Sequence, residues 1–409
     1  MLRFIFNSRL LIVILFAFSV LTSCNKDPEA LPENPIVPVT GTSLADTLAT
    51  RPDDSLFVRL LIKAGMIESL SNQTLSQTLF VPGNSAIKNF LSFYAGTFGI
   101  NIPAIASDSV FSAFITNAVP ADVAKSVLQY HIVPQKLMSA DFTNAFPNLQ
   151  YPSLFNPAPQ ISSLFRLTNF VSSNNGFFLN NVPLLNKDIM ASNGVIHELA
   201  AVNFPPSKML WNRIVDDSTL SLLKELILRA DSGAAVFTTA LNNPGANFTV
   251  FAPENLAVKK AIFLLSGGLI SVTDPDSVFV QFIRSNLVTT RLITGLLSYH
   301  IFDGRSVSSP PVISTPRAGR AFLNNFPVTP AFYKTLLNAD TSLRNHPGVQ
   351  LAVTMVGPIA GSATVKGLIN QTAANILIQP NPLNNTTSNQ HCVNGILHKI
   401  DQVLLPFLP

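Results

Sequence analysis

Two stretches of the chain decide its fold: Thr78-Leu79-Phe80-Val81-Pro82-Gly83-Asn84-Ser85-Ala86 and Thr249-Val250-Phe251-Ala252-Pro253-Glu254-Asn255-Leu256-Ala257. Their apolar, β-prone first half predicts a buried strand, with Phe80 and Phe251 in two cores. Proline lacks a backbone donor and ends the strand. Asn84 and Asn255 are the predicted N-caps of the helices that follow. The same strand-to-helix corner, written twice, indicates two copies of one domain.

Other landmarks recur in the same order in both copies. An amphipathic helix is predicted from Leu56 and from Leu220, and a further helix from Asp108 and from Asp276. The next helical stretch ends in a Tyr-His pair, which is Tyr130-His131 in the first copy and Tyr299-His300 in the second. We expect each pair at a helix-to-strand corner.

Each copy closes with Asn-Gly, two apolar residues and a histidine, which is His197 in the first copy and His398 in the second. Asn-Gly between β-prone segments predicts a tight hairpin turn at positive φ. The spacing between copies is 169 residues at the Tyr-His histidines and 201 at the closing histidines. An insertion of about thirty residues therefore lies between these landmarks in the second copy, and we expect it to form surface loops.

The start of the chain has the features of a targeting segment. Arg3 and Arg9 flank an apolar run, Leu10 to Leu21, which is too short to favour a bilayer-spanning helix. The run ends in Leu21-Thr22-Ser23-Cys24, which resembles the lipobox of bacterial lipoproteins. By that resemblance, cleavage precedes Cys24, which is then acylated. A secretory peptide with an incidental cysteine and a single membrane anchor are the open alternatives.

The predicted organisation has four parts. They are a lipoprotein signal peptide at 1–23, lipidated Cys24 with a Pro-rich linker at 24–43, and domains at 44–206 and 207–409. The prolines make the linker an extended, semi-rigid spacer. If Cys24 is lipidated, Cys392 is the one remaining cysteine and has no disulfide partner within the chain. We expect Cys392 to be a small buried residue.

Composition bounds the class of protein. The chain has 409 residues, of which 47% are hydrophobic and 12% charged, and this excludes a disordered chain. Without Arg3 and Arg9, 24 basic residues stand against 22 acidic ones, so the net charge falls from +4 to +2. Such a small, dispersed charge gives no indication of nucleic acid as a partner.

The combined motifs resemble the fasciclin (FAS1) domain, in two tandem copies that cover nearly all of the mature chain. This resemblance implies an α+β fold in which each copy is a wedge-shaped β-sandwich flanked by helices. It also implies adhesion or extracellular interaction without general catalytic chemistry. In animal members the Tyr-His region has been implicated in adhesion, which makes Tyr130, His131, Tyr299 and His300 the candidate binding residues. Gln390-His391-Cys392-Val393 and the Pro-rich insert depart from the family pattern.

A structural interpretation of the motif histidines stands beside the adhesive one. A histidine at a corner can be partly buried and hydrogen-bonded to backbone, which fixes the local fold, and a neighbouring tyrosine can bury its ring. His197 and His398, together with Phe80, Asn84, Phe251 and Asn255, are predicted to be structural motif residues. The adhesive interpretation of the Tyr-His pairs requires that their side chains be exposed.

The sequence gives no catalytic or metal-binding motif. His-Glu-x-x-His, paired Cys-x-x-Cys, Gly-x-Ser-x-Gly and phosphate-binding glycine loops are all absent. We therefore predict no catalytic residue, no metal and no cofactor. A hydrolase that uses His and Asp of the second domain's insert is the enzymatic alternative.

The predicted function is that of a non-enzymatic, lipid-anchored surface protein that mediates adhesion or extracellular binding. The alternative is an accessory binding lipoprotein of an outer-membrane glycan or nutrient uptake assembly. The predicted partners are the membrane, through the lipid on Cys24, and an unidentified protein or polysaccharide. The predicted location is the cell envelope, at the outer membrane.

Overall fold

The computed structural model describes residues 41–144, 146, 148–285, 287–306, 320–339, 341–378 and 387–407. The predicted signal peptide and Cys24 lie outside these residues, as does nearly all of the predicted linker. We refer to residues 44–206 as repeat 1 and to residues 207–409 as repeat 2.

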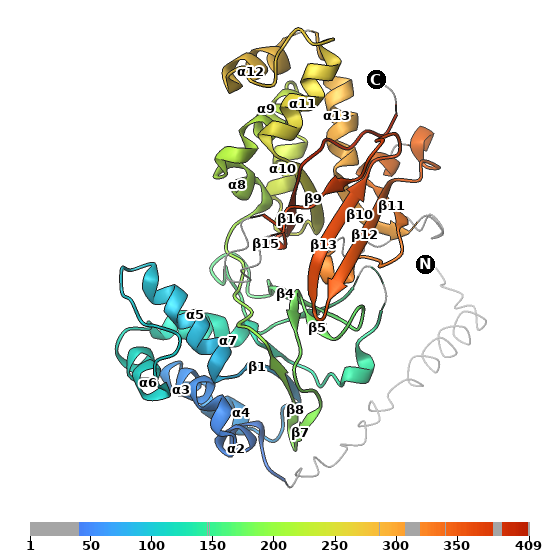
Figure 1. Cartoon of the computed structure of the whole chain (residues 1–409). Coiled ribbons are helices and arrows are strands. Elements are labelled where there is room, and N and C mark those ends of the chain that lie inside the picture. The colour runs from blue at the N-terminus through green and yellow to red at the C-terminus, as the bar shows by residue number, and fades with distance from the viewer. Residues whose placement is uncertain are drawn as a thin grey trace, which may run out of the picture. The chain divides into compact units, whose positions relative to one another are not determined.

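Repeat 1 begins with helices and ends with strands. Its elements are α2 (Leu44–Ala49), α3 (Ser55–Lys63), α4 (Ile67–Ser71), β1 (Gln77–Pro82), α5 (Asn84–Gly96), α6 (Asp108–Asn117), α7 (Ala121–Tyr130), β2 (Ile132–Val133), β3 (Leu149–Pro152), β4 (Thr168–Ser172), β5 (Phe178–Leu179), β6 (Val182–Pro183), β7 (Ile189–Ala191) and β8 (Gly194–Leu199). The strands form two sheets, in the orders β2-β1-β8-β7 and β3-β4-β5-β6. The helices of this repeat lie together beside β1 and β8 (Figure 1).

Repeat 2 follows the same order. Its elements are α8 (Leu210–Val215), α9 (Ser221–Ala230), α10 (Phe237–Asn242), β9 (Phe248–Pro253), α11 (Asn255–Leu265), α12 (Asp276–Arg284), α13 (Thr290–Tyr299), β10 (Ile301–Ser306), β11 (Ala331–Thr335), β12 (Val349–Val356), β13 (Ile359–Lys366), β14 (Ala374–Asn375), β15 (Gln390–Cys392) and β16 (Gly395–Ile400). Whereas repeat 1 has two sheets, these strands form one, in the order β14-β13-β12-β11-β10-β9-β16-β15. In repeat 2 the strands β11 to β14 join the strands β10, β9, β16 and β15 through the pairing of β10 with β11.

The strand of the repeated motif lies inside each sheet, as predicted. β1 pairs in parallel with β8, and Phe80 stands opposite His197. β9 pairs in parallel with β16, and Phe251 stands opposite His398. Both phenylalanines are completely buried, and a proline is the last residue of each strand. The predicted core positions of Phe80 and Phe251 are therefore confirmed.

The predicted amphipathic helices are confirmed as α3 and α9. Leu56, Phe57, Leu60 and Leu61 form the buried face of α3, and α9 buries Leu222, Leu223, Leu226 and Ile227. Each fully buried leucine contributes about 2 kcal/mol through the apolar surface it removes from water. These faces pack into the larger apolar core of each repeat.

The prediction that the insertion in repeat 2 forms surface loops is wrong for its described part. β12 and β13 have eight residues each, whereas β4 and β5, at the same places in the strand order of repeat 1, have five and two. Val349, Leu351 and Val353 are buried, and the residues between them are partly exposed. This alternation is the period-2 pattern of a strand with one face on a core, so apolar burial draws the extra length into the sheet.

A segment of repeat 2, Arg320 to Phe326, packs against repeat 1. Asn148 donates to Asn325 Oδ1 at 2.6 Å, and Asn325 donates to Ser172 Oγ at 2.9 Å. The guanidinium carbon of Arg320 lies 5.0 Å from the centre of the Phe170 ring. The hydrogen-bonded part of this contact is buried, since Asn148 and Asn325 are 3% and 1% exposed.

Candidate functional site

The Tyr-His pair of repeat 1 lies at the predicted corner between α7 and β2 and is completely buried. His131 Nε2 accepts a hydrogen bond from the Asn203 backbone N–H at 3.1 Å. Nδ1 must therefore carry the proton, which it donates to the Val127 carbonyl at 2.7 Å. Burial disfavours the charged ring and lowers the pKa of His131 to about 4. His131 is thus a neutral crosslink between the end of α7 and the end of repeat 1.

The second pair repeats this geometry at the corner between α13 and β10. His300 Nε2 accepts from the Leu404 N–H at 2.9 Å, and Nδ1 donates to the Leu296 carbonyl at 2.8 Å. Burial lowers the pKa of His300 to about 4, and its exposed fraction is 3%. Again the ring joins a helix end to the last residues of its repeat.

The two tyrosines are buried beside these histidines. Tyr130 donates to the Thr168 carbonyl at 3.4 Å, and Tyr299 donates to the Gly348 carbonyl at 2.6 Å. Burial raises the pKa of both phenols. All four candidate binding residues are therefore enclosed, and their bonds are those of the structural interpretation. The adhesive interpretation requires exposure that these side chains do not have.

In the closing histidines, His197 and His398, the proton is on Nε2, whereas in the Tyr-His pairs it is on Nδ1. His197 Nδ1 accepts from the Asp188 N–H at 3.2 Å, and Nε2 donates to the Leu137 carbonyl at 2.8 Å. In the same way, His398 accepts from the Asn389 N–H and donates to the Ala321 carbonyl. Burial lowers the pKa of His197 and lowers that of His398 to about 4.

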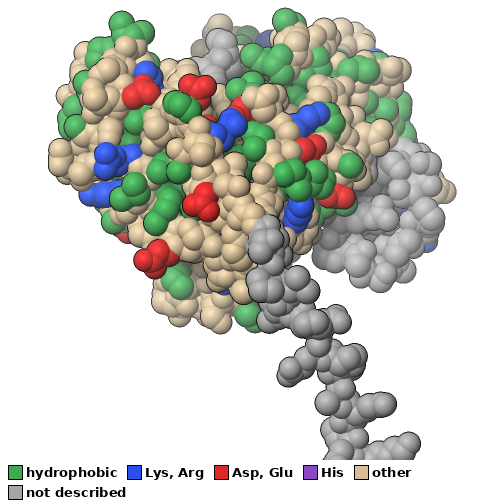
Figure 2. All heavy atoms as spheres, turned by 90° about the horizontal axis from the view of Figure 1, so that it is seen from below, with side chains coloured by type: hydrophobic (Ala, Val, Ile, Leu, Met, Phe, Trp, Pro, Cys, Tyr) green, Lys and Arg blue, Asp and Glu red, His purple; other side chains and the backbone are tan. Residues whose placement is uncertain are grey.

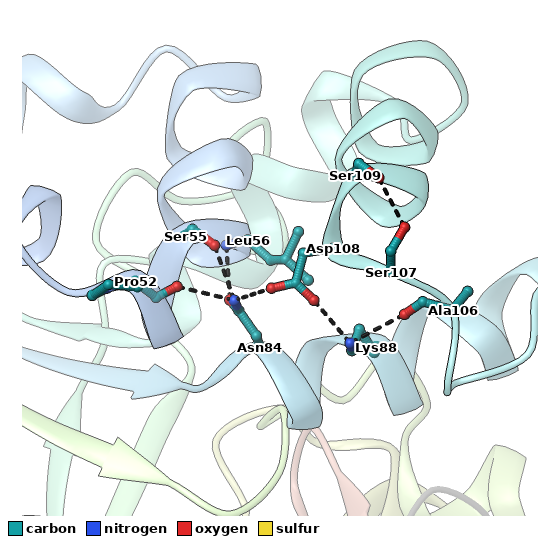
Figure 3. Close-up of polar contacts among 9 residues, drawn as sticks. All are labelled: Pro52, Ser55, Leu56, Asn84, Lys88, Ala106, Ser107, Asp108 and Ser109. Carbon is teal, nitrogen blue, oxygen red and sulfur yellow. Dashed lines mark hydrogen bonds and ion pairs between the residues drawn. The ribbon is translucent and has the colours of Figure 1, made fainter.

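The prediction that Asn84 and Asn255 cap the helices behind them is wrong. Asn84 is the first residue of α5, whose N-cap is Gly83. Its amide oxygen accepts instead from the Leu56 N–H of α3 at 2.9 Å, and its amide nitrogen donates to Asp108 of α6 at 2.7 Å. Lys88 completes the cluster with an ion pair to Asp108 at 2.8 Å. Figure 3 shows these groups converging from three helices.

Repeat 2 has the same polar cluster. Asn255 accepts from the Leu222 N–H of α9 at 3.0 Å and donates to Asp276 of α12 at 3.1 Å. Lys259 pairs with Asp276 at 2.7 Å. The motif asparagine therefore caps a neighbouring helix, not its own, and so ties three helices to the end of the central strand.

The two predicted hairpins form, β7–β8 and β15–β16, but not for the predicted reason. Neither glycine has a positive φ. A Cβ on Gly194 would lie 2.2 Å from the Gln77 carbonyl oxygen, and a Cβ on Gly395 would lie 2.4 Å from that of Phe248. Glycine is needed there because the central strand passes too close for any side chain.

The asparagine before each of these glycines bonds outside its hairpin. Asn193 accepts from the Leu44 N–H at the start of α2 and donates to the Leu70 carbonyl at the end of α4. In repeat 2, Asn394 accepts from the Leu210 N–H at the start of α8. These bonds join the last hairpin of each repeat to its first helix.

The described residues contain no group of three His, Cys, Asp or Glu side chains able to hold a metal ion. Cys392 is buried, as predicted, and burial raises the pKa of its thiol. Of the helices described, none is long and apolar enough to cross a membrane. On the face seen in Figure 2, Lys and Arg are interspersed with Asp and Glu, with hydrophobic side chains among them.

Sequence reasoning missed one surface feature of repeat 1. Phe90, Tyr94 and Phe98 follow one another at four-residue intervals; the first two share a face of α5, and Phe98 lies in the turn that follows the helix. The Phe90 ring also contacts Phe204, with ring centroids 5.4 Å apart. The four-residue spacing is visible in the sequence. The contact between Phe90 and Phe204 is not visible in the sequence, because the two residues lie 114 positions apart (204 − 90).

The repeated strand-to-helix corner, the parallel pairing of its strand with the closing hairpin and the buried histidine crosslinks define a tandem α+β domain protein. A family model described as the fasciclin domain matches residues 52–205 and 227–406. The chain therefore belongs to the fasciclin family and carries two FAS1 domains. Fasciclin domains are generally adhesion-type modules without catalytic activity and are typically extracellular or at the surface.

Among solved structures, a FAS1 domain pair from the insect cell adhesion molecule fasciclin I matches this chain with 13% sequence identity and a TM-score of 0.30. The match covers 86% of this chain and 96% of that chain. Comparison with curated proteins gave no match.

Proposed function

We propose that this chain is a non-enzymatic, lipid-anchored surface protein whose two fasciclin domains mediate adhesion or extracellular binding. The observation that carries the proposal is the match of the fasciclin model to both repeats. The proposed partner is an extracellular protein or polysaccharide, bound by surface residues of the repeats.

The state of the motif histidines argues against their use as catalytic groups. A general acid or base must reach the substrate and exchange protons near the working pH. His131, His300 and His398 are buried, have pKa values of about 4 and are hydrogen-bonded to backbone at both ring nitrogens. These rings hold the fold and are not free to exchange protons with an external substrate.

The proposed anchor is a lipid on Cys24, which follows the predicted signal peptide. Several acyl chains give stable membrane attachment where one is marginal. The test is labelling of expressing cells with radioactive palmitate, comparing the wild type with Cys24→Ser. We expect the variant to lose the label and to leave the membrane fraction. Equal labelling of both proteins would contradict the anchor.

The binding role is tested with the full chain on cells. Cells that express the wild type are compared with cells that lack the protein for attachment to immobilised matrix proteins, glycan arrays and other cells. We expect attachment to at least one of these surfaces to depend on the protein. Equal attachment to all of them, with folded protein confirmed on the cells, would reject the proposal. Selective glycan binding with co-purification of a transporter would favour an accessory role in uptake.

A further inference from the structure

A continuous row of aromatic rings runs along one face of repeat 1. Ring centroids are 5.1 Å apart between Phe98 and Tyr94, 6.1 Å between Tyr94 and Phe90, and 5.4 Å between Phe90 and Phe204. Phe98 is 65% exposed and Phe204 48% exposed. We call these four residues the aromatic row. It leads from α5 to the segment that joins the two repeats.

The aromatic row ends at a pocket. Phe204 lines a cavity of about 320 Å³ together with Phe155, Pro157, Pro205 and Pro206. A smaller hollow, lined by Phe90 and Tyr94, shares Val123 and Val127 of α7 with this cavity. The row and the cavity therefore form one apolar surface, which we call the junction groove.

The fold does not require the aromatic row. The motif asparagines place repeat 2 at an offset of 171 residues along this helix (255 − 84), so Ala261, Leu265 and Leu269 stand where Phe90, Tyr94 and Phe98 stand in repeat 1. After the closing histidine the offset is 201, and Leu405 replaces Phe204. Repeat 2 forms the equivalent helix, α11, without any of these rings. Four aromatic residues in repeat 1 alone indicate a role beyond stability.

The chemistry of the groove favours one class of ligand. Its prolines have no N–H, and the Ser126 hydroxyl already donates to the Asp122 carbonyl at 2.8 Å. Few groups are left to replace the water around sugar hydroxyls. Aromatic-lined grooves instead suit proline-rich segments in the polyproline II conformation, which need few hydrogen bonds and lose little entropy.

A carboxylate supplies the charge preference. Asp122 lines the cavity and is exposed in the first turn of α7. Within the part of the chain that the structure describes, no basic side chain forms an ion pair with it. A Lys or Arg of a ligand seated in the cavity would find this carboxylate unpaired.

We infer that the junction groove binds a proline-rich, extended segment of a partner protein that carries a Lys or Arg beside its prolines. This inference rests on the proposed binding function and names a class of partner for it. The prolines pack on the aromatic row and in the cavity, and the basic residue pairs with Asp122.

The test measures binding of a fluorescent synthetic peptide, Lys-Pro-Pro-Leu-Pro-Pro-Leu-Pro, to the full chain by fluorescence anisotropy. Peptides with Glu in place of Lys, or with Gly-Ser in place of the prolines, are the ligand controls. We expect Tyr94→Ala and Phe204→Ala to weaken binding at least about tenfold, as at interface hot spots. The matched variant of repeat 2, Leu265→Ala, should leave the affinity unchanged. Asp122→Asn should weaken binding about threefold and remove the preference for Lys over Glu.

Binding that is absent, or unchanged in both aromatic variants, would overturn the inference. If either variant unfolds, Phe98→Ser at the most exposed ring replaces it. Binding of cellohexaose that Phe204→Ala abolishes, without peptide binding, would overturn the ligand class and keep the site. Cell attachment that depends on the protein but not on Phe204 or Tyr94 would reject the groove and leave the proposed function standing.

Discussion

Glu198 in repeat 1 and Lys399 in repeat 2 stand at the same position, directly after the closing histidine, and carry opposite charges. Glu198 pairs with Arg51, which also binds Asp54 at 2.6 Å. Lys399 lies 2.6 Å from Asp217 and 3.6 Å from Glu254. In both repeats, therefore, the residue after the closing histidine forms an ion pair. Its charge can be negative or positive, provided that its partners carry the opposite charge.

Other positions do not vary between the repeats. The histidine rings, the motif asparagines and the hairpin glycines make the same bonds or close contacts in each. The histidines and glycines are buried and the asparagines partly buried, and all of them meet backbone atoms whose positions the fold fixes. Groups that meet other side chains can be exchanged together with their partners, whereas groups that meet backbone atoms cannot.

The largest expected effect is the loss of stability when the pH is low enough to protonate the buried histidines of both repeats in the unfolded chain. His131, His300 and His398 have pKa values of about 4 in the folded chain, against 6.5 for the ordinary side chain. As the pH falls below 6.5, the unfolded chain binds protons and the folded chain does not, so stability falls until about pH 4. From pH 7 to pH 5 we expect each to cost about 2 kcal/mol, or roughly 6 kcal/mol together.

Urea unfolding at pH 7 and pH 5 measures this loss. Carboxylates with ordinary or lowered pKa values stay largely ionised in this range, so they contribute little to the difference. Stability that does not change between the two pH values would show that the rings are accessible to protons in the folded state.

The second test removes the matched core rings. Phe80→Ala and Phe251→Ala should each destabilise the protein by about 3–5 kcal/mol, because each leaves a cavity at a completely buried position. Phe98→Ala, at an exposed ring, should cost less than about 0.5 kcal/mol. Thermal unfolding compares the three. A large cost in one repeat only would mean that the two central strands are not equivalent.

The third test separates the two charge pairs. Lys399→Gln leaves Asp217 and Glu254 without their common cation, and we expect a loss of about 2 kcal/mol. Glu198→Gln leaves Arg51 bound to Asp54 and should cost about 1 kcal/mol or less.

The pKa of Asp217 provides an independent readout of the third test. Burial alone would raise this pKa, but hydrogen bonds from Lys399 and Thr219 hold it below its usual range. Its stabilising contribution is therefore present above the ordinary pKa and lost as the pH falls through the folded value. NMR titration of the carboxyl should show the pKa rising in Lys399→Gln. A pKa that does not move would contradict the assigned pair.

The smallest expected effect concerns the motif asparagines. Asn84→Ala and Asn255→Ala should each cost about 1 kcal/mol, the value of a lost helix cap. Hydrogen exchange should locate the loss at the first turns of α3 and α9, where Leu56 and Leu222 donate to the asparagines. Faster exchange at the starts of α5 and α11 instead would restore the capping role predicted from the sequence.

The sequence predicts what depends on neighbours along the chain. The buried strands, the amphipathic helices, the Tyr-His corners and the closing hairpins all follow from local periodicity, and all are confirmed. Asn84 was assigned to the wrong helix because its partner, Leu56, lies 28 residues earlier. The positive φ predicted for Gly194 is wrong. A side chain is excluded there by the close approach of the Gln77 backbone, 117 residues away (194 − 77).

The candidate site shows the same division. The lipid attachment at Cys24 stays a prediction from a local motif, outside the described residues. The local pattern places the Tyr-His pairs at helix-to-strand corners, as the structure confirms, but their burial depends on residues distant in the sequence. The junction groove depends on the meeting of α5, α7 and the segment between the repeats, so no single stretch of sequence shows it.

The parallel pairing of β1 with β8 sets the order of assembly during synthesis. Gln77 pairs with Gly194, and in repeat 2 Phe248 pairs with Gly395, so the ribosome must add 117 and 147 further residues before each central strand meets this partner. Until then one edge of a mostly apolar strand is unpaired, in a topology whose distant contacts make folding slow. Each repeat is therefore complete only when its last strand has been made: a nascent chain cut short before His197 has no complete repeat, and one cut short just before His398 has repeat 1 alone.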